Sequence, residues 1–426
     1  MEKINILVLG SGGREHTFCW KLVKSKITNR LFIAPGNAGT SVIATNLDIG
    51  INDFEGIKKA VIQNQINLVL VGPEDPLVNG IHDFFLSDEI LKYIPVIGPQ
   101  KLGATLEGSK EFAKDFMLRH EIPTAEYGSF TAENINEGYA FLDRMKSPYV
   151  LKADGLAAGK GVLIIDDLSE AKYELANMLL DKKFGVASSK VVIEEFLKGI
   201  ELSCFVLTDG KNYLTFPLAK DYKRIGEGDK GLNTGGMGAI SPVPFSDKQF
   251  KKKIHDRIVR PTIEGLQKDN IPYVGFVFIG LIKVGEEPYV IEYNVRMGDP
   301  ETQVVLPRIK NDLAELLLAA AEKRLSQIEI EIDNRSATTV VAVSGGYPED
   351  YLKGKEISGL QKVQDSNVFH AGTIIKNGKT ITNGGRVLAV TSFGKNHKSA
   401  LKQSYREIQK INFEGMYFRG DIGFDL

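Results

Sequence analysis

Four short apolar runs in the first hundred residues, separated by segments long enough for a helix, constrain the fold of this chain most strongly. They lie at residues 4–9, 31–34, 68–71 and 95–97. Unbroken apolar runs are typical of strands that are buried on both faces, and their alternation with helices predicts a parallel sheet. We therefore expect residues 1–104 to form one doubly wound α/β domain.

Length and composition narrow the class of protein. A chain of 426 residues exceeds the size at which one hydrophobic core usually stops growing, about 250 to 300 residues, so several domains are expected. Its 53 Lys and Arg residues are balanced by 54 Asp and Glu residues, which predicts no basic surface for nucleic acid. The only cysteines, Cys19 and Cys204, lie far apart, and no window approaches a membrane span. We expect a cytoplasmic, monomeric enzyme that acts on small molecules, without nucleic-acid or membrane partners.

The remainder of the chain predicts a central α+β core, a small lid and a third domain. A helical pattern around residues 110–117 precedes Pro123, and strands around a glycine-rich loop predict a lid over residues 123–189. The core is expected at residues 105–122 and 190–328, and a small α+β domain at residues 329–426. The core strands are expected at residues 191–193, 201–207, 213–217, 274–283 and 289–295, and those of the last domain at residues 338–343, 369–375 and 387–391.

The stretch 288–296 carries the strongest chemical signal. Because side chains alternate between the faces of a strand, Glu292, Asn294 and Arg296 should project to one side. A carboxylate and an amide oxygen two residues apart suit Mg²⁺, and an arginine beyond them suits a phosphate or a carboxylate. A polar, solvated sheet face is the simpler interpretation of an isolated strand, but the turn at residues 297–301 and three glycine-rich segments favour a site.

The first glycine-rich segment, residues 10–16, turns from the first strand into the first helix. Backbone NH groups at a helix N-terminus favour an anion, so Gly12, Gly13 and Arg14 could hold a phosphate. A dinucleotide site would need a third glycine where Glu15 stands, which weakens that alternative. Glycines that merely permit a tight turn are the structural alternative.

Two further glycine-rich segments could approach phosphate. Residues 152–161 carry two lysines between two strands and could close over a triphosphate, although their spacing is not that of a Walker A loop. Residues 231–238 form the third cluster; taken alone, each segment also fits a mobile surface loop. After the strand at residues 191–193, backbone groups at residues 194–197 could contact an adenine, and Glu201 could hold a ribose hydroxyl. The six histidines show no metal-ligand spacing, and no Ser/His/Asp arrangement is apparent.

Taken together and in this order, these segments resemble the ATP-grasp ligases, and within them the phosphoribosylamine–glycine ligase family. The resemblance covers essentially the whole chain. The motifs that carry it lie at residues 10–16, 72–78, 152–161, 233–238, 294–301, 369–373 and 384–388.

The resemblance implies that ATP phosphorylates glycine and that 5-phosphoribosylamine attacks the glycyl phosphate, with ATP and Mg²⁺ or Mn²⁺ required. It implies catalytic roles for Arg296 and Asp221 and metal binding by Glu292 and Asn294. The implied ATP-binding residues are Lys110, Lys152, Gly155, Gly159, Lys160, Gly161, Glu194, Glu195, Phe196, Leu197 and Glu201. The implied substrate-binding residues are Gly12, Gly13, Arg14, Glu74, Asp75, Asn233, Gly235 and Gly236.

The chain departs from the family pattern at several positions. Lys220 and Tyr222 stand where the family usually has glutamine and histidine, and Met297 stands where it has phenylalanine, so direct roles for the side chains at 220 and 222 are in question. Residues 273–284 contain no carboxylate that could join Glu292 at a metal, so phosphate oxygens or water would complete the ligand shell. Three alternatives stay open: another ATP-grasp ligase or carboxylase, a nicotinamide-dependent oxidoreductase, and a nucleotide-binding module without activity.

Overall fold

The computed structural model describes residues 3–155 and 161–426, so Gly159 and Lys160, both expected to bind ATP, lie outside the described residues. The amino-terminal part is a parallel sheet with strand order β3-β2-β1-β4-β5. Its strands are β1 (Ile4–Gly10), β2 (Thr28–Pro35), β3 (Thr45–Asn46), β4 (Leu68–Val71) and β5 (Val96–Ile97). Its helices are α1 (Gly13–Leu22), α2 (Phe54–Gln63), α3 (Glu74–Val78), α4 (Ile81–Ser87) and α5 (Lys101–Gly108). The predicted doubly wound fold is confirmed.

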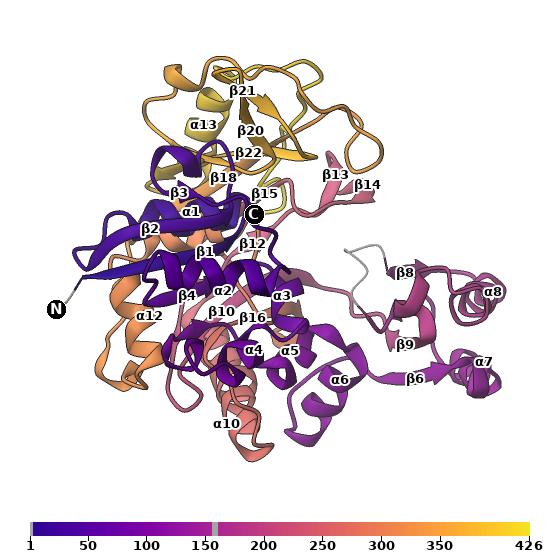
Figure 1. Ribbon diagram of the computed structural model, residues 1–426. Coiled ribbons are helices and arrows are strands. Elements are labelled where there is room, and N and C mark those ends of the chain that lie inside the picture. Colours follow the sequence, from indigo (N-terminus) through magenta and orange to yellow (C-terminus); the bar gives the residue numbers. More distant parts are fainter. Residues whose placement is uncertain (1–2, 156–160) are drawn as a thin grey trace.

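A small unit projects from the body of the molecule, at the right of Figure 1. It is a four-stranded sheet with the order β6-β9-β7-β8, and two helices pack on it around a separate apolar core. We call this unit the lid. Its elements are β6 (Tyr127–Thr131), α7 (Ile135–Arg144), β7 (Tyr149–Ala153), β8 (Val162–Ile165), α8 (Leu168–Leu179) and β9 (Lys190–Glu195).

The central sheet is antiparallel, with the order β11-β10-β16-β17. Helix α6 leads from the amino-terminal domain into the lid and packs beside this sheet. A π-helical turn at His255–Val259 joins α9 to α10. The bounds are α6 (Lys110–Arg119), β10 (Ile200–Thr208), β11 (Tyr213–Thr215), α9 (Lys248–Ile254), α10 (Arg260–Lys268), β16 (Gly275–Val284), β17 (Glu287–Asn294), α11 (Thr302–Val305) and α12 (Leu313–Ala321).

The third sheet, drawn mostly in yellow and orange in Figure 1, combines strands from distant parts of the chain in the order β12-β15-β18-β22-β19. Helix α13 packs on it, and two hairpins, β13–β14 and β20–β21, extend from it. The bounds are β12 (Lys220–Asp221), β13 (Arg224–Gly226), β14 (Lys230–Asn233), β15 (Gly238–Ser241), β18 (Ser336–Val343), β19 (Asn367–His370), β20 (Thr373–Lys376), β21 (Lys379–Thr382), β22 (Arg386–Gly394) and α13 (His397–Ile408).

The predicted multidomain α/β and α+β architecture is confirmed, with corrections to single strands. The run at residues 191–193 was expected in the central sheet, but β9 pairs with β6 and β7 in the lid. An apolar run does not specify its partner, and only tertiary packing decides the sheet. The strand expected at residues 369–375 is two strands, β19 and β20, interrupted at Ala371 and Gly372. The exact domain limits stay a prediction. No described helix has the length and apolar character needed to cross a membrane.

A buried histidine contact joins the amino-terminal domain to the third sheet. The backbone NH of His370, on β19, donates to Nδ1 of His16, on α1, at 2.7 Å, and the two ring centroids are 5.6 Å apart. Burial lowers the pKa of His16 to about 3 and that of His370 to about 4, with the neighbouring His370 ring lowering His16 further. Both rings are therefore neutral in the folded protein at neutral pH.

This contact predicts a loss of stability in mild acid. The unfolded chain binds a proton at His16 below its ordinary pKa of about 6.5, whereas the folded chain does not, so stability falls as the pH drops below that value. At pH 5 the loss from His16 alone should be about 2 kcal/mol. His16→Asn keeps an acceptor near the Nδ1 position and should give a smaller decrease in unfolding free energy between pH 7 and pH 5, measured by urea denaturation. His255→Gln, at an exposed ring, serves as the control, and an unchanged decrease in the His16 variant would contradict the prediction.

Candidate active site

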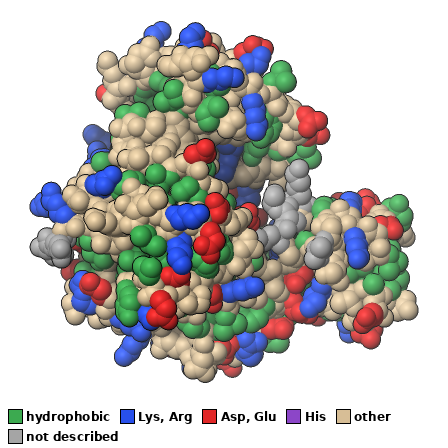
Figure 2. Space-filling view, viewed as in Figure 1, with side chains coloured by type: hydrophobic (Ala, Val, Ile, Leu, Met, Phe, Trp, Pro, Cys, Tyr) green, Lys and Arg blue, Asp and Glu red, His purple; other side chains and the backbone are tan. Residues whose placement is uncertain are grey.

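A cavity of about 420 Å³ lies where α3, α5 and α6 of the first part of the chain meet β7, β9 and β17. Figure 2 shows the hollow between the lid and the body, with acidic and basic side chains along it. Nine of the expected site residues line the cavity, and they come from segments up to 222 positions apart: Glu74, Asp75, Lys110, Lys152, Gly161, Glu194, Glu292, Asn294 and Arg296. The fold thus brings both expected metal residues and part of the expected phosphate and substrate residues to one place.

Three lysines and one glutamate form the basic wall of the cavity. The buried carboxylate of Glu194, on β9, accepts ion pairs from Lys152 at 2.9 Å and from Lys114 at 3.0 Å. Burial lowers the pKa of Lys110 and brings that of Lys114 to about 8, although Glu194 opposes the shift at both. A buried lysine that is only partly neutralised favours a negatively charged ligand. The wall therefore suits phosphate.

The position of Lys110 follows from how α6 begins. The Ser109 hydroxyl caps the helix by accepting from the backbone NH of Phe112 at 3.1 Å. The carboxylate of Asp154, which follows β7, accepts from the backbone NH of Glu111 at 2.8 Å. The ammonium group of Lys110 lies 3.4 Å from the carbonyl oxygen of Gly155. These contacts tie the first turn of α6 to the loop after β7 that carries Lys152.

Glu292 and Asn294 face the cavity from the end of β17, next to a bulge at Ile291. Within the described residues, neither side chain makes a hydrogen bond or an ion pair, and the Asn294 amide is buried with an unpaired polar atom. The unpaired atom is the amide nitrogen Nδ2, and buried polar groups are usually paired, so this nitrogen lacks a hydrogen-bond acceptor within the described residues. No described group of three or more His, Cys, Asp or Glu side chains could hold a metal ion. The pair fits a Mg²⁺ that takes its remaining ligands from phosphate and water.

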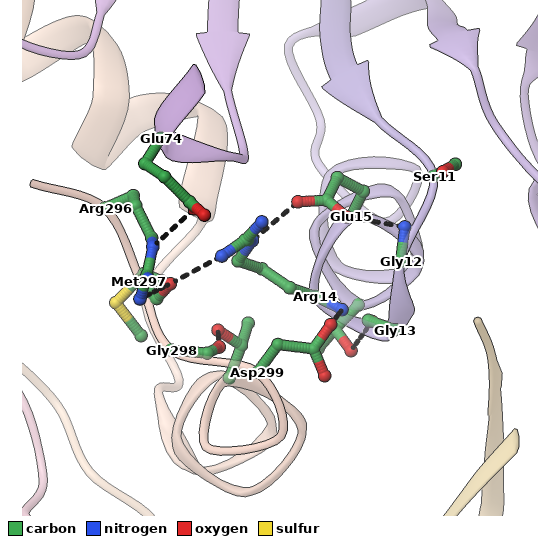
Figure 3. A network of polar contacts seen from close by, with 12 residues as sticks. Ser11, Gly12, Gly13, Arg14, Glu15, Glu74, Arg296, Met297, Gly298 and Asp299 are labelled. Atoms are coloured by element: carbon green, nitrogen blue, oxygen red, sulfur yellow. Dashed lines mark hydrogen bonds and ion pairs between the residues drawn. The ribbon is translucent and has the colours of Figure 1, made fainter. Parts of the chain in front are cut away.

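Arg296 joins the end of β17 to the amino-terminal domain (Figure 3). Its guanidinium group pairs with Glu107 at 2.8 Å and with Glu74 at 3.1 Å. Burial raises the pKa of Glu107 to about 7, although Arg296 opposes the shift. Burial alone would also raise the pKa of Glu74, but Arg296 and Arg14 lower it overall. Arg296 is thus held by two carboxylates and still lines the cavity.

The first glycine-rich segment lies beside this arginine and not in the cavity. Arg14 donates to the carbonyl oxygen of Met297 at 3.0 Å and to the Glu15 carboxylate at 2.6 Å, and its backbone NH donates to Asp299 at 3.2 Å. Glu15 accepts from the backbone NH of Gly12 at 2.6 Å. A Cβ atom at Gly12 would lie 2.8 Å from this carboxylate. The Glu15 carboxylate therefore occupies part of the backbone cradle, which argues against a dinucleotide site.

The glycine-rich segment at residues 231–238 lies against the turn at residues 297–301, which the amino-terminal glycine segment also contacts. Arg386, on β22, donates to the carbonyl oxygens of Gly235 at 2.5 Å and of Asp299 at 2.6 Å. A Cβ atom at Gly236, where φ is +117°, would lie 2.4 Å from the Pro300 ring, so glycine is required there. Asn233, expected to contact substrate, lies at the exposed end of hairpin β13–β14.

Asp221, Glu201 and Lys223 form a cluster of charged side chains. Lys223 pairs with Glu201 at 2.6 Å, and this ion pair lowers the pKa of Glu201. Burial raises the pKa of Asp221, although Lys223 opposes the shift. Burial also raises the pKa of Glu301 to about 7, and the neighbouring Asp221 adds to this shift. One of these two carboxyls can therefore keep a proton near neutral pH.

Some expected residues are not brought to the cavity. Among the described residues, its lining does not include Glu195, Phe196, Leu197 or Glu201. The backbone NH of Glu195 donates to Glu126 at 2.9 Å. Gly155 lies against Ala187, whose backbone a Cβ atom would meet at 3.0 Å.

Four residues of the site were not identified from the sequence. Lys114 lies one helical turn after Lys110, and this i,i+4 spacing was the one available signal. Glu107 lies among the apolar residues of α5, and nothing in that pattern indicates that its carboxylate pairs with an arginine. Asp299 and Glu301 belong to the turn at residues 297–301, but no pattern in the sequence assigned their side chains a role.

Comparisons with known proteins agree with this arrangement. Three domains described for phosphoribosylglycinamide synthetase match the chain: the N domain at residues 4–107, the ATP-grasp (A) domain at residues 108–302 and the C domain at residues 337–425. Phosphoribosylamine–glycine ligase of Vibrio vulnificus is 44% identical over 99% of this chain and 98% of its own length. The bifunctional purine biosynthetic protein PUR2,5 of Pichia angusta is 45% identical over 99% of the chain, which spans only 54% of that protein.

A solved structure is similar over nearly the whole chain. The crystal structure of phosphoribosylamine–glycine ligase from Thermotoga maritima superposes with a TM-score of 0.84 at 34% sequence identity, and the match covers 98% of this chain and 100% of that one. The match includes the amino-terminal, ATP-grasp and carboxy-terminal parts. The chain therefore belongs to the phosphoribosylglycinamide synthetase family of ATP-grasp ligases, as its motifs predicted.

Proposed function

We propose that the chain ligates glycine to 5-phosphoribosylamine at the expense of ATP, giving glycinamide ribonucleotide, ADP and phosphate in purine biosynthesis. One observation carries the proposal: the side chains of Glu292 and Asn294, which make no hydrogen bond or ion pair within the described residues, lie in one cavity with the lysines of the opposite wall. That arrangement suits a nucleoside triphosphate with its metal. The substrates are inferred from the names of the relatives. A carboxylase with the same nucleotide site would share the cavity but would not need glycine.

The reaction divides into two steps, phosphorylation of glycine and attack of the amine on the glycyl phosphate. A glycine carboxylate oxygen attacks the γ-phosphorus of ATP, and ADP leaves. The amine nitrogen of phosphoribosylamine then attacks the carbonyl carbon of glycyl phosphate, phosphate leaves and the amine loses a proton. Mg²⁺, or Mn²⁺ in its place, would be held by Glu292 and Asn294 and would neutralise charge on the phosphoryl group.

The charged side chains in and beside the cavity have distinct roles in these steps; Asp221 is not among the residues that line it. Lys110 and Lys152 orient the phosphates, because both ammonium groups approach the cavity from elements that are tied together at the start of α6. Arg296 stabilises the negative charge of the glycine carboxylate and of the acyl phosphate. Asp221 holds the amine and takes up the proton released in the second step, since burial keeps the pKa of its carboxyl raised.

The remaining expectations are assigned by position. Gly12, Gly13 and Arg14 would hold the phosphate of the phosphoribosyl substrate, and Glu74 and Asp75 would contact its ribose side. Gly235, Gly236 and the hairpin residue Asn233 would close the same subsite. A monomeric state and a cytoplasmic location also remain proposals; the two cysteines are free and buried, as expected in a reducing compartment.

An assay of ADP formation with each substrate omitted in turn tests the function. The proposal predicts that sustained ADP release requires both glycine and phosphoribosylamine. Bicarbonate-dependent release without glycine would instead indicate a carboxylase. Binding of a nicotinamide dinucleotide without affinity for ATP would indicate an oxidoreductase.

Removal of the carboxylate charge at the metal position gives the first prediction from this site. Glu292→Gln keeps the shape of the side chain but removes the charge that offsets Mg²⁺, so kcat should fall by about 100-fold or more while the melting temperature stays nearly constant. Glu287→Gln, at a half-buried position at the other end of the same strand, is the matched control and should retain activity. Full activity of the Glu292 variant at ordinary Mg²⁺ would remove Glu292 from the metal site.

Removal of the Arg14 side chain gives the second prediction from this site. Arg14→Ala removes a charge-assisted contact to the substrate phosphate, worth roughly 1.5 to 3 kcal/mol, or about one to two decades in KM for phosphoribosylamine. The KM for ATP should change little, because the nucleotide cavity does not include Arg14. Arg30→Ala, on the surface of the same domain, is the control. Equal shifts in all three Michaelis constants, or none, would show that Arg14 acts only through the fold.

A further inference from the structure

The segment formed by residues 419–425 contacts the short strand that carries Asp221. Two side chains flank Asp221, and both bind the carboxylate of Asp425. Lys220 Nζ lies 3.1 Å from Asp425 Oδ2, and the Tyr222 hydroxyl donates to Asp425 Oδ1 at 2.8 Å. Lys220 and Tyr222 are both buried. One carboxylate thus holds the residues on both sides of Asp221.

The alternation of side chains gives this contact a consequence for Asp221. Lys220, on β12, and Tyr222, directly after it, both reach Asp425, so they lie on one side of this extended segment and the side chain of Asp221 projects to the other. The charged neighbours of Asp221 are Lys223, Glu201 and Lys220. Strand β12 is only two residues long, and backbone hydrogen bonds also hold the residues next to it: Ala219 pairs with Ser203, and Tyr222 bonds to Gly238 and Met237. The contacts of Asp425 with the side chains of Lys220 and Tyr222 add to these backbone bonds in fixing the direction in which Asp221 points.

A fully buried arginine anchors the same segment to hairpin β13–β14. Arg419 pairs with Asp229 at 2.7 Å and with Asp421 at 2.8 Å, and it donates to the carbonyl oxygen of Arg224 at 3.1 Å. The Asp421 carboxylate in turn accepts from the backbone NH of Gly228 at 2.7 Å. Figure 1 shows the C label beside β12 and β15, close to this hairpin. The segment is held at one end by the hairpin and reaches β12 at the other.

We propose that Asp425 is a positioning residue for the ligase reaction. By clamping Lys220 and Tyr222 it sets the orientation of Asp221 and of the hairpin that leads to Asn233 and Gly235. The inference rests on the proposed function for the role of Asp221, but the clamp itself is a property of the structure. Among the described residues, Asp425 is the one carboxylate paired with Lys220, so its removal leaves a buried ammonium group without a counter-charge.

The alternative is that Asp425 only stabilises the fold, and a double variant separates the two roles. Asp425→Ala removes both contacts, whereas the pair Lys220→Met and Asp425→Ala also removes the unpaired charge. If Asp425 positions β12, the double variant should regain most of the lost melting temperature but should keep a low kcat. If it only neutralises Lys220, both melting temperature and kcat should return toward wild type, which would overturn the proposal.

Two measurements decide the outcome at a temperature at which each variant is folded. Hydrogen exchange should become faster in residues 220–238 of Asp425→Ala, and kcat should fall by about 10- to 100-fold, because misplacement by about 1 Å can have such an effect. The KM for ATP should change by less than about two-fold, since these residues do not line the nucleotide cavity. Glu414→Gln removes an exposed ion pair of the same domain and should change neither the hydrogen exchange of residues 220–238 nor kcat.

The exchange measurement keeps this inference separate from the proposed function. If the wild-type protein shows no ADP release that depends on glycine and phosphoribosylamine, the proposed function fails, whereas faster exchange in the hairpin would still support the clamp. If exchange and kcat of Asp425→Ala both match the wild-type protein, the positioning role is overturned even when the ligase activity is established.

Discussion

The paired contacts of Arg296 with Glu74 and Glu107 hold the end of β17 against the amino-terminal domain. Loss of one partner from a buried ion pair leaves an uncompensated charge, at a cost of roughly 3 to 5 kcal/mol. The position of Glu292 and Asn294, the proposed metal-binding pair on β17, depends on this contact, because Asn294 lies two residues before Arg296. Met297 directly follows Arg296, and its carbonyl oxygen accepts a hydrogen bond from the guanidinium group of Arg14. The loop proposed to hold the substrate phosphate and the cavity proposed to hold the nucleotide are thereby joined through one short segment.

The sequence predicted those features that depend on local order. Apolar runs identified the parallel strands of the first domain, and period-two alternation placed Glu292, Asn294 and Arg296 toward one cavity. Features that depend on long-range pairing were not predictable. The apolar run of β9 fits either sheet, so its pairing in the lid could not be predicted. No local pattern indicates that Lys114 pairs with Glu194, 80 positions later. The roles of individual residues remain proposals.

The amino-terminal glycines illustrate how one motif supports different chemistry. Their backbone NH groups suggested an anion site, and the structure places an internal anion, the Glu15 carboxylate, against Gly12. This carboxylate also lies near Gly10 and Gly72, where a Cβ atom would collide with it. The glycines are therefore needed for close packing around Glu15, apart from the ligand contact proposed for them. A cradle that is partly filled in this way leaves less room for a dinucleotide than for a single phosphate.

The central claim is that ATP activates the glycine carboxylate as an acyl phosphate before the amine attacks. Glycine labelled with ¹⁸O in both carboxylate oxygens tests it most directly, with the released phosphate analysed by mass spectrometry after turnover with ATP and phosphoribosylamine. The account predicts that each phosphate carries one labelled oxygen derived from glycine. Phosphate without label, formed while glycinamide ribonucleotide accumulates, would contradict activation of the carboxylate by phosphoryl transfer.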